Sequence, residues 1–174
     1  QRAASMILAC DMLRRGDEEC PGVQLPDHSQ SDASISIGLW VGKDTSPNKV
    51  AKVGEDGSPA QVADCPVCGV ELDWSVDDNG ERVLATCTNQ ACSANGLAGH
   101  LPFWTVDEDV YRELPSLLIG TADKFVQIVS KPETGRLFGL ADAHRDPPDL
   151  IIQDELHLIS GPLGTMAGLF ETAI

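Results

Sequence analysis

Basic residues are scarce in this chain of 174 residues. Twelve Lys and Arg stand against 27 Asp and Glu, which gives a formal net charge of −15. A domain that binds nucleic acid on its own usually carries a basic surface, so this composition argues against tight, independent binding. It remains compatible with a domain that contacts a strand locally, through helix N-termini and a few side chains, beside a more basic partner domain.

Long apolar runs are absent as well. The longest early run, Met6 to Cys10, is too short for the core of a signal peptide or for a membrane span. With 42% hydrophobic residues, the chain can still form one buried core, so we expect a soluble globular protein without a membrane partner. The sequence opens inside a helical pattern, and we expect both ends to be cuts through a longer protein.

Two catalytic signatures are also missing. The absence of a His-Glu-x-x-His pattern argues against a metal-dependent hydrolase built on Asp154, Glu155 and His157. The segment from Gly38 to Asp44 is similar to a Walker A loop, but its glycines are one residue too close together and Asp44 stands where a hydroxyl is needed. We therefore expect a true Walker A loop upstream, and no appreciable ATP hydrolysis by this chain alone.

What is present is an alternation of helices and strands. Helical spacing predicts helices at residues 1–15, 121–130 and from about 163 onwards. In the first of them, the apolar residues at this spacing are Ala3, Met6, Ile7, Cys10 and Leu13. Alternation and short apolar runs predict strands at residues 35–41, 116–120 and 149–153, with a Pro-containing loop at 131–148. This order is typical of the α/β class, a mainly parallel sheet covered by helices.

Residues 49–100 interrupt the alternation. They are rich in glycine and polar residues, carry four cysteines and lack a strong helical period, so we interpret them as an insertion. We predict three segments: residues 1–48 as the first part of the α/β domain, 49–100 as the insertion, and 101–174 as the second part of the domain. We further expect that residues 65–92 can be replaced by a short linker without unfolding the domain.

Four of the six cysteines form two close pairs. Cys65 and Cys68 have the spacing C-x2-C, Cys87 and Cys92 have the spacing C-x4-C, and 18 residues lie between the pairs. In a chain without a secretion signal, such a cluster indicates metal ligands more than disulfides. Four thiolates suit a structural Zn²⁺ with a closed tetrahedral shell. His100 could replace Cys92 as the fourth ligand, although its separation from Cys87 along the sequence makes it the poorer candidate.

Two adjacent carboxylates follow the predicted strand at 149–153. At the carboxyl end of a buried strand, Asp154 could hold a hydrated Mg²⁺, and Glu155 could orient and deprotonate a water that attacks a nucleotide phosphate. An Asp-Glu pair at this place can also be the solvated start of a turn or helix. Upstream, Gly120 ends a strand and Thr121 is a good N-cap, so the next helix could present N–H groups, with Lys124 nearby, to a backbone phosphate. A threonine there can equally be only a cap.

The two motifs together resemble superfamily 2 helicases of the DExH kind. The resemblance rests on Gly120–Phe125, the Pro-containing loop, and the box Asp154-Glu155-Leu156-His157. More narrowly, the chain resembles the DrmA family of helicases from DISARM antiphage defence systems. The stretches that carry this narrower resemblance are 37–42, Pro47-Asn48, 118–125 and 148–165.

The resemblance implies that the chain is part of the first, RecA-like ATPase lobe, with an inserted zinc ribbon. Asp154 and Glu155 then form the Walker B box, and His157, which can also be an ordinary histidine at a helix start, couples the nucleotide site to the strand-binding surface. Gly120, Thr121 and Lys124 lie near the nucleic-acid backbone. The expected cofactors are ATP, Mg²⁺ and Zn²⁺.

The resemblance also implies partners and a location. The expected partners are DNA, the second helicase lobe of the same protein and other defence-system subunits, and the expected location is the cytoplasm. A zinc-ribbon interaction module without catalysis is the alternative function. It explains the cysteines and leaves the other two motifs unexplained.

Overall fold

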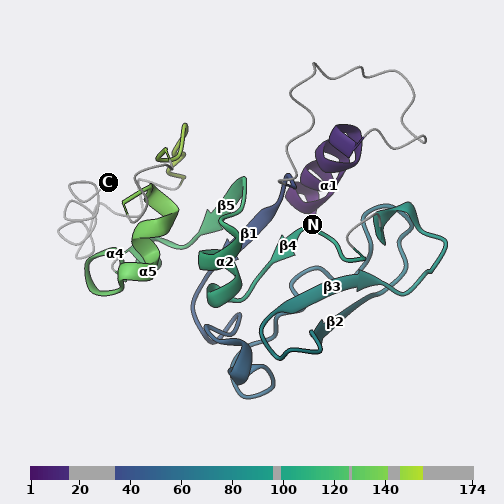
Figure 1. The fold of residues 1–174 in the computed structure, drawn as a ribbon, viewed down its shortest axis with the longest axis horizontal. Helices are drawn as coiled ribbons and strands as arrows, with labels where there is room; N and C mark the ends of the chain where they lie inside the picture. Colours follow the sequence, from purple (N-terminus) through teal and green to yellow (C-terminus); the bar gives the residue numbers. More distant parts are fainter. Residues whose placement is uncertain (16–33, 96–98, 126, 141–145, 155–174) are drawn as a thin grey trace. The chain divides into compact units, whose positions relative to one another are not determined.

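The computed structural model describes residues 1–15, 34–95, 99–125, 127–140 and 146–154, which form two compact units, Gln1–Ile119 and Gly120–Ile174 (Figure 1). The first unit contains α1 (Arg2–Arg15), β1 (Ile37–Trp40), η2 (Val50–Lys52), β2 (Leu72–Val76), β3 (Val83–Cys87), η3 (Ser93–Asn95), β4 (Phe103–Trp104) and α2 (Asp107–Glu113). Strand β5 (Leu117–Gly120) ends at the boundary between the units. The second unit contains α3 (Ala122–Phe125), α4 (Gln127–Ser130), α5 (Pro132–Gly135) and η4 (Arg136–Phe138).

The main sheet has three strands in the order β4-β1-β5. Strand β1 pairs in parallel with β4, with Ile37 opposite Phe103 and Gly38 opposite Trp104. The parallel sheet and its helices confirm the expected α/β class, whereas the RecA-like arrangement stays a prediction. Gly38 lies inside β1, in contact with the Pro115 ring, where a side chain would collide. This placement supports the conclusion that residues 38–44 are not a phosphate-binding loop.

Both faces of β1 are covered by helices. Trp40 is fully buried, and its indole N–H donates to the Tyr111 hydroxyl of α2 at 2.8 Å. Ile37, an odd number of residues away and therefore on the opposite face, packs against the cluster that includes Ala4 and Leu8 of α1. Alternation had predicted a half-buried strand with the aliphatic side chains on one face. Instead, the most buried position is Trp40, on the other face, because α2 supplies an aromatic and polar partner there.

Helix α1 confirms the first predicted helix but turns a different face inward. Its buried residues are Ala4, Ile7, Leu8, Asp11 and Met12, whereas Met6 and Cys10 are exposed. The inward face includes Asp11, whose carboxylate accepts the Ile35 N–H at 2.9 Å and forms ion pairs with Arg14 and Arg15. A charged residue can be buried when it is paired in this way, so Asp11 can share the inward face with Leu8 and Met12.

The second unit differs from the sequence prediction in two places. The Pro-containing loop includes the short helix α5, which starts with Pro132, because proline suits the first turn of a helix. Residues 149–154 contain no strand, and Leu150 and Ile152 are 74% and 80% exposed. A buried strand requires backbone partners from distant segments, and none of the described strands pairs with these residues. The helix expected from about 163 lies outside the described residues.

Residues 65–95, here called the cysteine hairpin, carry the antiparallel pair β2–β3 and pack onto the main sheet. Ala85 of β3 forms a bridge with Leu101, whose N–H donates to the Ala85 carbonyl at 2.8 Å. The buried Asp109 carboxylate of α2 accepts the Val83 N–H at 3.0 Å. Contacts thus cross the expected segment boundary at residue 100, and the three-segment division itself stays a prediction.

Candidate metal centre

The first pair of cysteines lies on a tight turn. The Gly69 N–H donates to the Cys65 carbonyl at 2.9 Å, and the Cys65 N–H donates to the Val70 carbonyl at 2.7 Å. Gly69 has φ +71°, a left-handed conformation that favours glycine. This turn brings the side chains of Cys65 and Cys68 to the same side, as a C-x2-C pair requires.

The second pair comes from the end of β3 and the segment after it. Cys87 is the last residue of β3, and Asn95 at the end of η3 fixes its backbone: the Cys87 N–H donates to Asn95 Oδ1 at 2.8 Å, and Asn95 Nδ2 donates to the Cys87 carbonyl at 3.0 Å. This bridge folds the chain back so that Cys92 faces Cys87. The role of Asn95 was not predicted, because the cysteine spacing contains no signal for it.

The four sulfur atoms converge on one point. They all lie within 4.8 Å of one another, with Cys65 and Cys92 at 3.8 Å and Cys68 and Cys87 at 3.4 Å. A tetrahedral ion with metal–sulfur bonds of about 2.3 Å needs sulfur atoms about 3.8 Å apart. The four thiols can therefore hold one metal ion such as Zn²⁺ with little movement.

The protonation of the thiols depends on their surroundings. The Val70 N–H, which bonds to the sulfur of Cys68, lowers the pKa of that thiol to about 7. Burial raises the pKa of Cys92 to about 12 and also raises the pKa of Cys87, although each sulfur accepts a backbone N–H, from Ala94 and Asn89 respectively. Buried thiols of this kind become thiolates when a cation compensates their charge, so metal binding would release protons.

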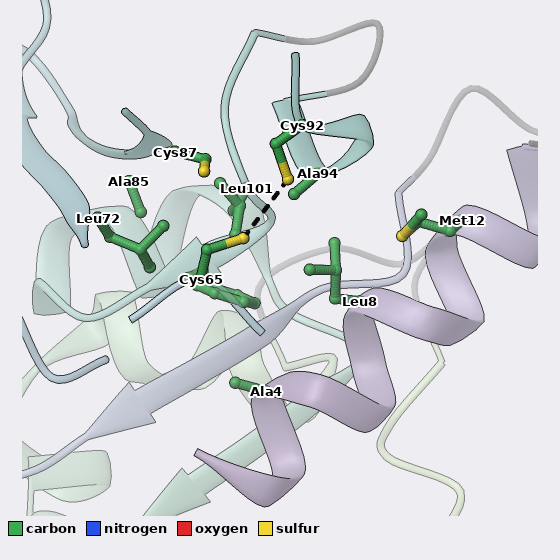
Figure 2. Close-up of a cluster of buried hydrophobic side chains, with 11 residues drawn as sticks. Ala4, Leu8, Met12, Cys65, Leu72, Ala85, Cys87, Cys92, Ala94 and Leu101 are labelled. Atoms are coloured by element: carbon green, nitrogen blue, oxygen red, sulfur yellow. Dashed lines mark hydrogen bonds between the residues drawn. The ribbon is translucent and has the colours of Figure 1, made fainter. Parts of the chain in front are cut away.

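Three of the four candidate metal ligands are part of the hydrophobic core of the unit. Cys65, Cys87 and Cys92 belong to one buried cluster with Ala4, Leu8 and Met12 of α1, Leu101 before β4 and Phe103 of β4. Figure 2 shows Leu8 and Met12 of α1 on the side of the helix that faces the sulfur atoms of Cys65 and Cys92. The candidate metal centre thus lies within the cysteine hairpin, in contact with the core cluster that α1 helps to form.

The other candidate ligands lie elsewhere. The ring of His100 stacks edge-on against Trp104 with ring centres 5.5 Å apart, and its Nδ1 lies 3.1 Å from the Leu101 carbonyl oxygen. His100 is not among the converging groups, and Cys92 is. Cys10 is exposed on α1 and is not among them either. Cys20 lies outside the described residues.

The two motifs of the second unit are only partly described. Asp154 is exposed and in no regular element, whereas Glu155 and His157 lie outside the described residues. Gly120 and Thr121 are exposed, and the Thr121 carbonyl accepts the Lys124 N–H at 3.0 Å as α3 begins. Lys124 is only 1% exposed. The catalytic and nucleic-acid-binding roles of these residues stay predictions.

Fold and site together define an α/β unit with a candidate four-cysteine metal centre built into its core. No helix among the described residues is long and apolar enough to cross a membrane. In comparisons with known proteins, no family model matches the chain.

The chain is similar to the DISARM protein DrmA of Bacillus paralicheniformis (strain ATCC 9945a / NCIMB 11709 / CD-2), with 30% identity over 216 residues. The alignment covers 94% of this chain and 19% of the relative, so the chain spans about a fifth of the relative's length. No solved structure matches. The expected resemblance to DrmA is confirmed.

Proposed function

We propose that the chain is the part of a DISARM antiphage helicase that carries the Walker B box of the first ATPase lobe. The observation that supports this proposal most is the similarity to the DISARM protein DrmA along 94% of the chain. The parallel sheet with helices on both faces is compatible with such a lobe. The whole protein would use ATP hydrolysis to move along or unwind nucleic acid.

In this proposal the acidic box binds Mg²⁺ and activates the water that attacks ATP. Asp154 holds a hydrated Mg²⁺ that accompanies ATP, and Glu155 orients the attacking water and takes its proton. His157 transmits the state of the nucleotide site to the strand-binding surface. The box must then lie at the end of a strand, which the described residues 149–154 do not form. We infer that this strand forms only when the rest of the lobe is present.

The proposed substrate is a nucleic acid, and DNA is the expected kind. Gly120 and Thr121 are exposed and can approach a backbone phosphate, while a contact from Lys124 requires its side chain to leave its buried position. With a net charge of −15, this chain needs the second lobe to supply most of the cationic surface.

The cysteine centre has a structural role in this proposal. Four thiolates around Zn²⁺ leave no position open for a substrate water, and their place in the core suits an ion that holds α1, β3 and β4 together. Metal analysis of the purified chain tests this part. We expect about one equivalent of zinc, and less than about half an equivalent after expression with ample zinc would contradict it.

The ATPase proposal is tested in a protein that carries this chain together with a Walker A loop and the second lobe. Glu155→Gln keeps the size of the side chain and removes the base, so ATP should still bind while turnover falls by about two orders of magnitude or more. Asp154→Asn should weaken the binding of Mg²⁺-ATP as well as turnover.

The measurements are steady-state ATPase activity with DNA present and nucleotide affinity. A folded Glu155→Gln protein that hydrolyses ATP at the wild-type rate would mean that Glu155 is not the base. Normal hydrolysis by both variants would overturn the assignment of the box. A full-length protein that binds zinc and nucleic acid without any ATPase activity would favour the zinc-ribbon interaction module.

A further inference from the structure

The four cysteine ligands differ in their access to solvent. Cys65 and Cys87 are each 2% exposed and Cys92 is 8% exposed, whereas Cys68 is exposed. Cys68 lies on the tip of the first turn, where Gly69 has no neighbour within 4 Å of its Cβ position. A reagent in solution can therefore approach Cys68 more readily than the other three cysteines, which are buried.

The nearest sulfur to Cys68 comes from the other pair. Cys68 Sγ lies 3.4 Å from Cys87 Sγ, and Cys65 Sγ lies 3.8 Å from Cys92 Sγ. A disulfide bond of about 2.0 Å between Cys68 and Cys87 needs only a small approach of two side chains, one of them on an exposed turn. Cys65 and Cys92 are both buried in the cluster that contains side chains of α1, so this pair has less freedom to approach.

We propose that Cys68 is an oxidation site, at which peroxides attack the metal centre and convert Cys68 and Cys87 into a disulfide with release of the metal. This inference rests on the proposed zinc site. Its chemical basis is general: exposed thiolates next to a second thiol are the cysteines that peroxides oxidise reversibly.

The reaction proceeds in two balanced steps. The Cys68 sulfur attacks one peroxide oxygen, so that an S–O bond forms, the O–O bond breaks and hydroxide leaves, which gives a sulfenic acid. The Cys87 sulfur then attacks the Cys68 sulfur, so that the S–S bond forms, the S–O bond breaks and a second hydroxide leaves. The two thiolates lose two electrons, one hydrogen peroxide becomes two waters after uptake of two protons, and the metal loses two ligands.

Oxidation of Cys68 and Cys87 would also change the packing of the hydrophobic core. Cys87 ends β3 and belongs to the same buried cluster as Leu8 and Met12 of α1. Loss of the metal from Cys87 would therefore loosen the contact between the cysteine hairpin and the helix that covers the sheet. A thiol reductant should reverse the change, because a disulfide is reducible and higher oxidation states are not.

The test uses the zinc-loaded chain with Cys10→Ser and Cys20→Ser, which removes the two thiols outside the centre. Hydrogen peroxide is added in steps, zinc release is followed with a chromogenic chelator, and disulfides are mapped by peptide mass spectrometry. We expect the Cys68–Cys87 disulfide first, at a rate that matches zinc release. Brief alkylation of the zinc-loaded protein should modify Cys68 at least about tenfold faster than the other three ligands.

Two further comparisons separate the possible outcomes. Cys68→His can still supply a zinc ligand and cannot form the disulfide, so this variant should retain zinc at peroxide concentrations that empty the parent. If the variant does not load zinc, two measurements on the parent test the proposal: which disulfide forms first, and how fast each cysteine is alkylated. A Cys65–Cys92 disulfide as the first product, or equal alkylation of all four cysteines, would overturn the proposal. A chain that never binds zinc would instead overturn the proposed metal site.

Discussion

The cysteine hairpin and the acidic segment at residues 149–154 are both marked by short sequence motifs, yet they differ in how the chain supports them. In the hairpin, Cys65 and Cys92 are 27 residues apart in sequence, and their sulfur atoms lie 3.8 Å apart. In the acidic segment, Asp154 is exposed and the three aliphatic residues before Gln153 are exposed as well.

The difference teaches which contacts each motif needs. The turns, the antiparallel strand pair and the Asn95 bridge that position the four cysteines are all formed within the cysteine hairpin. A buried strand that ends in Asp154 needs neighbours from elsewhere in the sheet. Changes to the two regions should therefore have effects of different size, which test the contrast between locally supported and distantly supported sites.

Removal of the metal should have the largest effect, and it should be confined to the first unit. Structural Zn²⁺ contributes roughly 10 to 16 kcal/mol of apparent binding free energy in small zinc domains, and that energy is coupled to folding. After chelation, amide hydrogen exchange should accelerate throughout β2 and β3, while α4 and α5 of the second unit change little. Unchanged exchange in β2 and β3 would show that the hairpin is held by its other contacts.

Leu8→Ala should destabilise the metal centre, because it removes a side chain that packs in the cluster with the cysteines. Leu8 is 1% exposed and packs in the cluster with the cysteines, so the cavity should lower the free energy of unfolding by about 2 to 5 kcal/mol and speed zinc loss. Met6→Ala on the same helix is the matched control, because Met6 is 56% exposed. Urea denaturation and zinc release of both variants are the measurements. Equal effects would mean that α1 does not support the hairpin.

The same contact between Leu8 and the hairpin predicts that replacing residues 65–92 by a linker lowers the stability of the unit, since excision uncovers Leu8.

Asp109 should make the contact between hairpin and α2 depend on pH. Burial raises the pKa of Asp109 from 3.8 to about 6, although it accepts the Val83 N–H and lies near Arg112. Between these two pKa values the folded chain binds a proton that the unfolded chain releases, so stability falls as pH rises through this window. The loss is at most about 3 kcal/mol and is complete above the folded pKa.

The Asp109→Asn variant isolates this effect, because asparagine keeps an oxygen that can accept the Val83 N–H and does not titrate. Urea unfolding at several pH values from about 4 to 7 gives the pH slope of each protein, and the wild-type slope minus the variant slope should be negative. Parallel curves for the two proteins would show that Asp109 keeps an ordinary pKa in the folded chain.

Ile152→Ala should have the smallest effect. Ile152 is 80% exposed, so its truncation in this chain should change the free energy of unfolding by less than about 0.5 kcal/mol. In a complete lobe, where we propose that residues 149–153 form a buried strand, the same substitution should cost about 2 to 5 kcal/mol. A large effect in the 174-residue chain would mean that the strand already forms without further partners.

The sequence by itself determined the elements whose signals are local. The first helix, the strands that became β1 and β5, and the helical stretch after Thr121 follow from apolar periodicity. The convergence of Cys65, Cys68, Cys87 and Cys92 follows from their paired spacing. The resemblance to DrmA was likewise visible in short motifs and is supported by 30% identity.

Only the tertiary structure decided which faces are buried and what surrounds the cysteines. Asp11 is buried on the inward face of α1 with its hydrogen-bond partner Ile35, and Trp40, bonded to Tyr111 of α2, is the most buried residue of β1. Asn95, Leu8 and Asp109 act on the hairpin through contacts that no spacing rule contains. Burial depends on which segments meet in space, and periodicity reports only which side of an element is apolar.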